Sequence, residues 1–165
     1  MKAIVMHAHG GPEVLVPADL PDPQPGPGEA LVEVRAASVN KRDVWVRRGL
    51  REPGLPRILG SDAAGQVIAV GAGVDSDWIG SDVVLLPYFY CGRCPSCLAG
   101  AENSCEQLRL LGGAVNGAYA GLVSVPAANL FRKPAGLSFE EAAAIPVVYL
   151  SAWHMLVTRA RLEVG

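Results

Sequence analysis

Residues 91–105, CGRCPSCLAGAENSC, contain every cysteine of this 165-residue chain. Cys91, Cys94, Cys97 and Cys105 follow the spacing C-x2-C-x2-C-x7-C, with glycines and a proline that permit tight turns between them. Thiolates are soft ligands, and four of them suit tetrahedral zinc. Because four protein ligands leave no position for water or substrate, the spacing predicts a structural zinc site rather than a catalytic one.

Two other arrangements compete with zinc for this segment. The first alternative is a pair of adjacent disulfides, which a reducing cytosol disfavours. An iron–sulfur cluster is the other, since C-x2-C-x2-C opens a ferredoxin-type motif. That motif continues with a cysteine three residues later and then a proline, whereas here the gap is seven residues and Glu106 follows Cys105. The spacing therefore favours zinc.

The composition is that of a globular chain rich in turns. Half of the residues are hydrophobic, 18% are charged and the formal net charge is −2, which argues against a sequence-independent nucleic-acid binder. With 19 glycines and 13 prolines, we expect many turns between short elements and hence a mainly β fold. No apolar stretch is long enough for a signal peptide or a membrane span, so we expect a cytoplasmic protein with no membrane partner.

Short strands are predicted along most of the chain. Alternation of apolar and polar side chains over residues 29–38 is typical of a half-buried strand. The five prolines of residues 17–30 predict an extended surface connection instead. Further strand signals cover residues 2–8, 57–74, 81–88 and 119–127. Strands at this spacing indicate a small barrel or sandwich.

Two helices are predicted near the end of the chain. Ser138 and Glu141 have the spacing of a capping box, and Pro146 ends this first helix and can start the second. The second helix is apolar on nearly every face from Val147 to Val157, which is typical of a helix buried on all sides. Little sequence follows it, so we expect another domain or another chain to cover it.

Together these features resemble the N-terminal catalytic domain of the medium-chain dehydrogenase/reductase superfamily, which includes zinc-type alcohol dehydrogenases and quinone oxidoreductases. The resemblance rests on the cysteine segment and on AASVNKRDVWVRRG (36–49), GSDAAGQVIAVG (60–71), GAYAGLVSVPAANL (117–130) and LSFEEAAAIP (137–146). It implies a GroES-like β-barrel over residues 1–146, with a zinc lobe at about 88–112 and C-terminal helices. It further implies that residues 147–165 form a connecting helix towards an absent Rossmann domain, which would bind NAD(P)H.

The resemblance also locates a candidate active site. Superfamily members with a catalytic zinc have cysteines at the positions of Asn40 and Val147 and a His-Glu pair at Ser61–Asp62, and none of these ligands is present. Asn40 is the main candidate for catalysis, as a hydrogen-bond donor to a substrate carbonyl, and equally a candidate turn residue that fixes local backbone. Ser61 and Asp62 are candidates to line the cleft, and a pairing of Asp62 with an arginine is the structural alternative.

Two basic residues of the same segment are candidates for cofactor contact. Lys41 matches a position where superfamily members place a basic residue against the cofactor pyrophosphate, and Arg42 is adjacent. For Arg47, Arg48 and Arg51 a solvated helix face is the favoured interpretation.

The function predicted from these residues is hydride transfer from NAD(P)H to a quinone, an enone or a related small carbonyl acceptor, without catalytic zinc. A simple alcohol would lack the Lewis acid that lowers the pKa of a bound oxygen, whereas such acceptors need only hydrogen-bond donors. No glycine-rich dinucleotide motif is present, so we expect the chain alone to be inactive. The alternatives are a zinc-dependent alcohol dehydrogenase with atypical ligands and a free-standing zinc-binding interaction module. A second copy of the chain is a further candidate partner.

Overall fold

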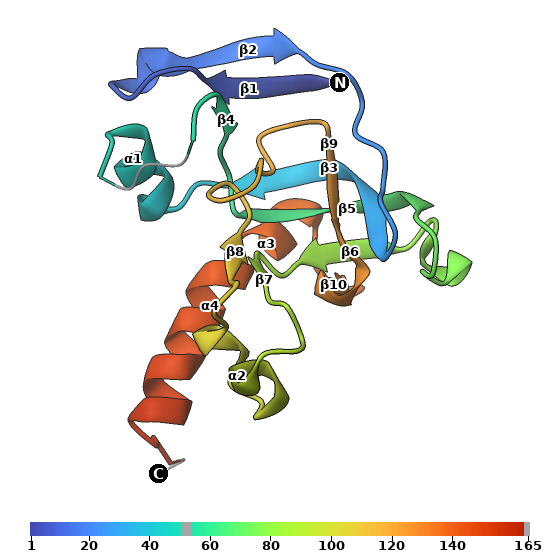
Figure 1. Ribbon diagram of the computed structural model, residues 1–165, viewed down its shortest axis with the longest axis vertical. Helices are drawn as coiled ribbons and strands as arrows, with labels where there is room; N and C mark the ends of the chain where they lie inside the picture. The colour runs from blue at the N-terminus through green and yellow to red at the C-terminus, as the bar shows by residue number, and fades with distance from the viewer. Residues whose placement is uncertain (51–53, 164–165) are drawn as a thin grey trace.

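Antiparallel strands form three sheets within residues 1–50 and 54–163, which the computed structural model describes (Figure 1). The largest sheet has the order β10 (Leu130–Arg132), β6 (Asp82–Leu85), β5 (Asp62–Val70), β3 (Glu29–Ser38), β9 (Leu122–Pro126). A second has the order β2 (Leu15–Asp19), β1 (Lys2–Met6), β4 (Arg57–Ile58), and the third pairs β7 (Tyr88–Phe89) with β8 (Arg109–Leu110). The mainly β fold predicted from the sequence is confirmed.

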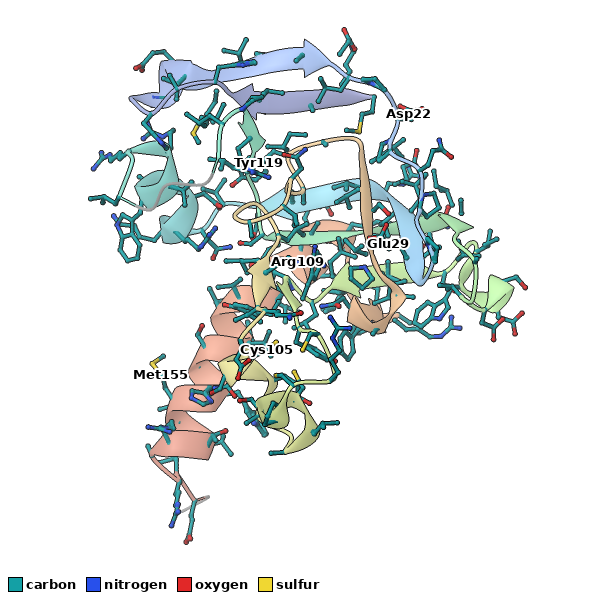
Figure 2. The ribbon with its side chains drawn as sticks, in the orientation of Figure 1. Asp22, Glu29, Cys105, Arg109, Tyr119 and Met155 are labelled. Atoms are coloured by element: carbon teal, nitrogen blue, oxygen red, sulfur yellow. The ribbon has the colours of Figure 1, made fainter. Side chains whose placement is uncertain are left out.

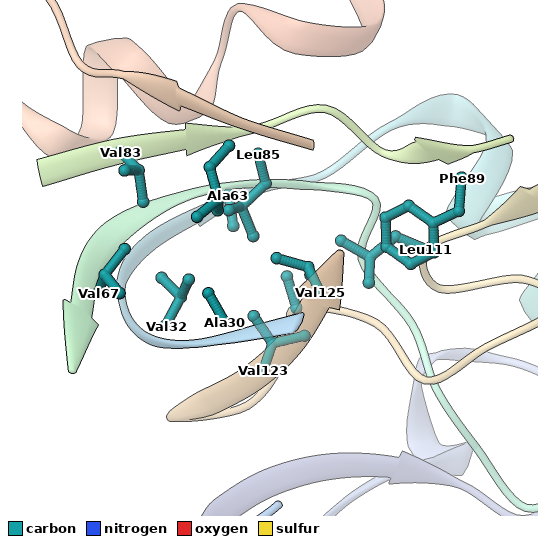
Figure 3. Packing of buried hydrophobic residues seen from close by; sticks show 12 residues of the cluster. Ala30, Val32, Ala63, Val67, Val83, Leu85, Phe89, Leu111, Val123 and Val125 are labelled. Atoms are coloured by element: carbon teal, nitrogen blue, oxygen red, sulfur yellow. The ribbon is translucent and has the colours of Figure 1, made fainter. Parts of the chain in front are cut away.

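The core lies inside the curved five-stranded sheet, where small and branched side chains meet (Figure 3). Ala30 and Val32 of β3 and Val67 of β5 are fully buried there, as the alternation in the sequence indicates. Gly65 of β5 permits a close approach to β3, since a Cβ at this position would overlap the backbone of Glu33. The two central strands can therefore pack tightly through their long antiparallel pairing.

Residues 117–121 connect the second sheet to the first. The amide of Ile4 in β1 donates to the carbonyl oxygen of Tyr119 at 2.8 Å, and the amide of Gly121 donates to that of Lys2 at 2.8 Å. On the other side, the amide of Val34 in β3 donates to the carbonyl oxygen of Gly121 at 2.9 Å. One short segment thus hydrogen-bonds to both sheets and brings them together around the core.

The proline-rich segment differs in part from its prediction. Residues 17–19 are the end of strand β2, with Pro17 opposite Ile4 in the register, rather than part of a surface connection. Proline is tolerated there because β2 is the edge strand of its sheet, so its missing N–H breaks no central ladder. Residues beyond Asp19 form the expected irregular connection up to β3.

The helices are short and lie outside the barrel (Figure 1). They are α1 (Lys41–Arg47), α2 (Pro95–Leu98), α3 (Phe139–Ala143), α4 (Pro146–Trp153) and a π-helical continuation of α4 (His154–Arg159), with single 3-10 turns at Pro12–Val14, Ser76–Trp78, Glu102–Ser104 and Ala127–Asn129. The capping box predicted at Ser138 and Glu141 is confirmed at the start of α3. No helix among these described residues is both long and apolar enough to cross a bilayer.

Helix α4 and its π-helical continuation project from the barrel (Figure 1), and their large apolar side chains are mostly exposed. Tyr149 and Trp153 are each 66% exposed, and Met155 points away from the barrel (Figure 2). The helix begins at Pro146 as predicted, and its N-terminal turn is the part that packs against β5. The sequence pattern correctly indicated an apolar helix, and residues 1–50 and 54–163 leave much of its surface uncovered.

The predicted solvent exposure of Arg47 is wrong. Its side chain is 8% exposed, and Nη1 donates to the carbonyl oxygen of Gly10 at 2.6 Å. The carbonyl oxygen of Arg47 in turn accepts the amide of Gly10 at 2.9 Å, so this arginine fastens α1 to the turn after β1. Arg48 is exposed as expected, and Arg51 lies outside the described residues.

Candidate functional site

The four cysteines lie together in a lobe that extends from β7 to β8. Their sulfur atoms are all within 4.8 Å of one another. The Sγ atom of Cys97 lies 3.5 Å from that of Cys94 and 4.0 Å from that of Cys91. A tetrahedron with Zn–S bonds of about 2.3 Å has edges of about 3.8 Å, so these separations fit one zinc ion. They are too long for a disulfide, whose S–S bond measures about 2.05 Å.

The backbone of the cysteine loop turns between the thiols and donates N–H groups that favour a thiolate at Cys91. Gly92 and Gly100 adopt positive φ angles of 69° and 73°, the turns between ligands for which glycine is suited. Backbone amides of Arg93 and Cys94 lower the pKa of the Cys91 thiol to about 6. Burial raises the pKa of the Cys97 thiol to about 12. A divalent cation would compensate the charge of thiolates this close together, as zinc does in sites of this composition.

A second cluster joins residues that are distant in the sequence, Asn40 before α1 and Ser61–Asp62 at the start of β5. The Nδ2 atom of Asn40 donates to Oδ2 of Asp62 at 3.0 Å and contacts Oγ of Ser61 at 3.4 Å. Asn40 is half-buried, whereas Ser61 and Asp62 are 0% and 1% exposed. Both therefore lie beneath the Asn40 amide and hold it, and their place in the lining of a cleft stays a prediction.

Asp62 also fixes the start of helix α4. Both of its carboxylate oxygens lie 3.2 Å from the backbone nitrogen of Val147, which donates from the first turn of the helix. A carboxylate at this end satisfies an otherwise unpaired amide and interacts favourably with the helix dipole. Val147, where superfamily members with a catalytic zinc have a cysteine, thus contributes its backbone to the cluster. Asp62 thus binds the N–H groups of Asn40 and Val147, and its pairing with an arginine stays a prediction.

The candidate cofactor residues, Lys41 and Arg42, begin helix α1. Lys41 is exposed, whereas Arg42 is half-buried and its guanidinium lies so close to Gly113 that a Cβ there would overlap it. Burial raises the pKa of the nearby Tyr88 hydroxyl, the Asp62 charge raises it further and the Arg42 charge opposes the shift. Tyr88 therefore stays a neutral hydrogen-bond donor.

A cavity of about 550 Å³ lies between the cysteine lobe and helix α4. It is mainly apolar, with a histidine and a serine at the helix side. Its walls are Leu86 from the barrel, Tyr88, Tyr90, Glu102, Asn103 and Leu108 from the lobe, and Leu150, Ser151 and His154 from the helix. Leu150 and Ser151 follow Val147 by one helical turn, whereas Asn40, Ser61 and Asp62 do not line the cavity themselves. Its volume suits a small organic molecule.

The family model for the alcohol dehydrogenase GroES-like domain matches residues 26–135, which include the Asn40–Asp62 cluster and all four cysteines. The chain belongs to this family. The GroES-like fold expected from the resemblance is thereby confirmed.

Individual relatives of this GroES-like domain are dehydrogenases. L-threonine 3-dehydrogenase of Pyrococcus horikoshii is 31% identical over 149 residues, which cover 86% of this chain and 41% of the relative. The solved structure of an NAD-dependent alcohol dehydrogenase is 50% identical with a TM-score of 0.97, and all of this chain covers 49% of it. A cobalt- and zinc-bound thermostable alcohol dehydrogenase from Pyrobaculum aerophilum is 35% identical with a TM-score of 0.92, and all of this chain covers 50% of it. The chain thus spans about half the length of these proteins or less.

Several residues of the GroES-like domain's site were not found from the sequence. Tyr88 and the helix residues of the cavity carry no local motif, because the cavity exists only once α4 packs beside the lobe. Tyr119 lies in a segment that supported the resemblance, yet its contact with Asp43 joins residues 76 positions apart. A tyrosine flanked by small residues, as in GAYAG, was the available signal of a side chain inserted between close backbones.

The buried Asp62 carboxyl should give the domain a distinctive pH dependence. Burial raises its pKa above the usual 3.8, and the charge of Asp43 adds to this, against the opposing hydrogen bonds from Asn40, Val147 and Ser38. The folded state therefore holds this proton more tightly than the unfolded state. The stabilising effect is full below pH 3.8 and is lost as the pH rises through the folded-state pKa. We expect the free energy of unfolding of the wild type, minus that of Asp62→Asn, to fall with rising pH.

Urea unfolding at a series of pH values from weakly acidic to neutral measures this difference. Asp77→Asn is the matched control, since Asp77 is exposed and its substitution also removes one carboxylate. The free energy of unfolding of each variant is subtracted from that of the wild type at the same pH. The pH dependence that the cysteines contribute is common to both proteins and cancels in this difference. A pH-independent difference for Asp62→Asn would contradict a raised pKa.

Proposed function

We propose that this chain is the GroES-like half of an NAD(P)-dependent oxidoreductase that transfers hydride to a quinone, an enone or a related carbonyl acceptor without a catalytic zinc. The main supporting observation is the meeting of Asn40, Ser61 and Asp62, an amide, a hydroxyl and a carboxylate already bound by N–H donors. Catalytic zinc sites are built chiefly from thiolate, imidazole and free carboxylate ligands. These residues do not fit such a site, whereas they suit a hydrogen-bonding site.

In this proposal Asn40 is the residue that contacts the acceptor. Its hydrogen bond to Asp62 fixes the amide plane, while its 3.4 Å contact with Ser61 is long enough to yield to a better acceptor. That second N–H is placed to donate to the acceptor oxygen as negative charge develops on it. NAD(P)H supplies the hydride when bound. The neutral Tyr88 hydroxyl offers a second donor from the cavity wall, and the apolar walls suit a ring or alkyl group.

The remaining roles follow from the same proposal. The four cysteines would hold one structural zinc that takes no part in hydride transfer. Lys41, exposed at the start of α1, would contact the cofactor pyrophosphate with Arg42 beside it. The uncovered apolar surface of α4 would pack against a following Rossmann domain, in keeping with the greater length of the relatives.

A zinc-dependent alcohol dehydrogenase with atypical ligands is the second candidate. Two observations favour it: His154 lines the cavity, and one similar structure is described as binding cobalt and zinc. The two candidates differ in metal content, because only the second requires a zinc besides the one held by the cysteines.

The test measures zinc content and activity together in the protein at its full natural length. We expect one zinc per subunit, with NAD(P)H oxidised by 1,4-benzoquinone or 2-cyclohexenone and no reduction of NAD(P)⁺ by simple alcohols. Two zincs per subunit together with alcohol oxidation would overturn this proposal in favour of the second candidate. Binding of one zinc with no hydride transfer would instead favour an interaction module.

A further inference from the structure

Tyr119 contacts both segments that carry the proposed active site. It lies between the three-stranded sheet that contains β1 and the large five-stranded sheet, in the connection from β8 to β9 (Figure 2). Its backbone amide donates to the carbonyl oxygen of Leu59 at 3.0 Å, two residues before Ser61. Its hydroxyl donates to Oδ2 of Asp43 in helix α1 at 2.9 Å. A single residue thus connects the start of β5 with the helix that follows Asn40.

Asp43 transmits this contact to Asn40. The same Oδ2 atom accepts the backbone amide of Asn40 at 2.9 Å, which fixes the residue where α1 begins. Asp43 is 3% exposed, and its other oxygen, Oδ1, has no hydrogen-bond partner among residues 1–50 and 54–163. The known hydrogen bonds of this buried carboxylate therefore converge on one atom, and the Tyr119 hydroxyl is the donor that comes from outside α1.

The ring of Tyr119 makes a second, independent contact with the site. Gly60 has a φ of 94°, and a Cβ there would overlap the Tyr119 ring. The ring consequently rests on the backbone of the residue that directly precedes Ser61. The hydroxyl thus acts on the segment that carries Asn40, and the ring supports the segment that carries Ser61 and Asp62.

We infer that Tyr119 is a positioning residue, which sets the orientation of the Asn40 amide towards Asp62 and towards the acceptor through its hydrogen bond to Asp43. It does not contact the acceptor itself. Burial and the Asp43 charge raise the pKa of the Tyr119 hydroxyl, so it remains a protonated donor over the working range of the enzyme. The structural part of this inference stands alone, and its catalytic part rests on the proposed function.

Tyr119→Phe tests the inference because it removes the hydroxyl and keeps the ring on Gly60. The first readout is the side-chain amide signal of Asn40 in ¹⁵N-labelled protein at full length, assigned by its loss in Asn40→Ser. We expect this signal to shift in Tyr119→Phe. The second readout is steady-state kinetics, where we expect kcat to fall roughly tenfold, since a displacement of about 1 Å can cost about a hundredfold. KM should change much less, because Tyr119 does not bind the acceptor.

Val83→Ala is the control for a general loss of stability. Val83 is fully buried in the barrel core and belongs to β6, away from Asn40. This variant should leave the Asn40 signal and the kcat unchanged. The inference is overturned if the Asn40 signal does not move in Tyr119→Phe, or if it moves while kcat is unchanged. It is also overturned if Val83→Ala shifts the Asn40 signal and lowers kcat to the same extent. If no acceptor is reduced at all, the proposed function fails, while the Asn40 signal still decides whether Tyr119 positions it.

Discussion

Replacing Cys94 with serine is expected to abolish zinc binding and unfold the lobe of residues 88–112. The lobe holds little regular structure besides helix α2, a 3-10 turn and the two-residue strands β7 and β8, so a bound zinc would supply most of its stability. Structural zinc sites contribute apparent binding energies of about 10–16 kcal/mol. That is comparable with the whole net stability of a domain, about 5–15 kcal/mol. Zinc per subunit should fall by one, and the thermal unfolding temperature should fall with it.

Zinc analysis by atomic emission and thermal unfolding followed by circular dichroism measure the two effects. Ser104→Ala is the matched control, because Ser104 is an exposed residue of the same lobe beside Cys105, one of the proposed ligands. It should retain its zinc and its unfolding temperature. Unchanged zinc content in Cys94→Ser would show that the cysteines do not hold the metal. A visible charge-transfer absorption in the unaltered protein would indicate an iron–sulfur cluster instead.

The cysteine lobe was the part most readily predicted from the sequence, because its ligands lie within 15 consecutive residues. Spacing over so short a distance restricts the loop, and glycine and proline reveal where it turns. The sulfur separations of 3.5 and 4.0 Å agree with that prediction. The capping box of α3 was predictable for the same reason, since Ser138 and Glu141 are one turn apart.

The Asn40 cluster could be located only through the resemblance to a known family. Asn40 and Asp62 are 22 residues apart, and no periodicity indicates that they meet. Even with the positions known, burial could not be foreseen, because Ser61 and Asp62 are covered only once Asn40 and the first turn of α4 meet the start of β5. The burial of Arg47 escaped prediction similarly, since its partner Gly10 lies 37 residues away.

Asn40→Ala is expected to lower kcat about a hundredfold while the fold persists. Removal of one donor that stabilises a developing oxyanion costs about 10²–10³ in kcat in enzymes of known mechanism. The hydrogen bond to Asp62 fixes the orientation of the Asn40 amide. A water molecule in its place would lack this fixed orientation towards the acceptor. Initial rates of NAD(P)H oxidation by 1,4-benzoquinone, at saturating acceptor, measure the loss in the protein at its full natural length.

Asn40 also precedes α1 as its N-cap, so the same variant can lose about 1 kcal/mol of stability. Asn40→Ser separates the two roles, because serine is also a favoured N-cap residue but has no side-chain amide to direct at the acceptor. We expect Asn40→Ser to unfold at the wild-type urea concentration and to lose as much kcat as Asn40→Ala. Arg48→Ala, at the exposed end of the same helix, should leave both quantities unchanged. Wild-type kcat in Asn40→Ser would assign Asn40 to the backbone of α1 alone and remove it from the chemistry.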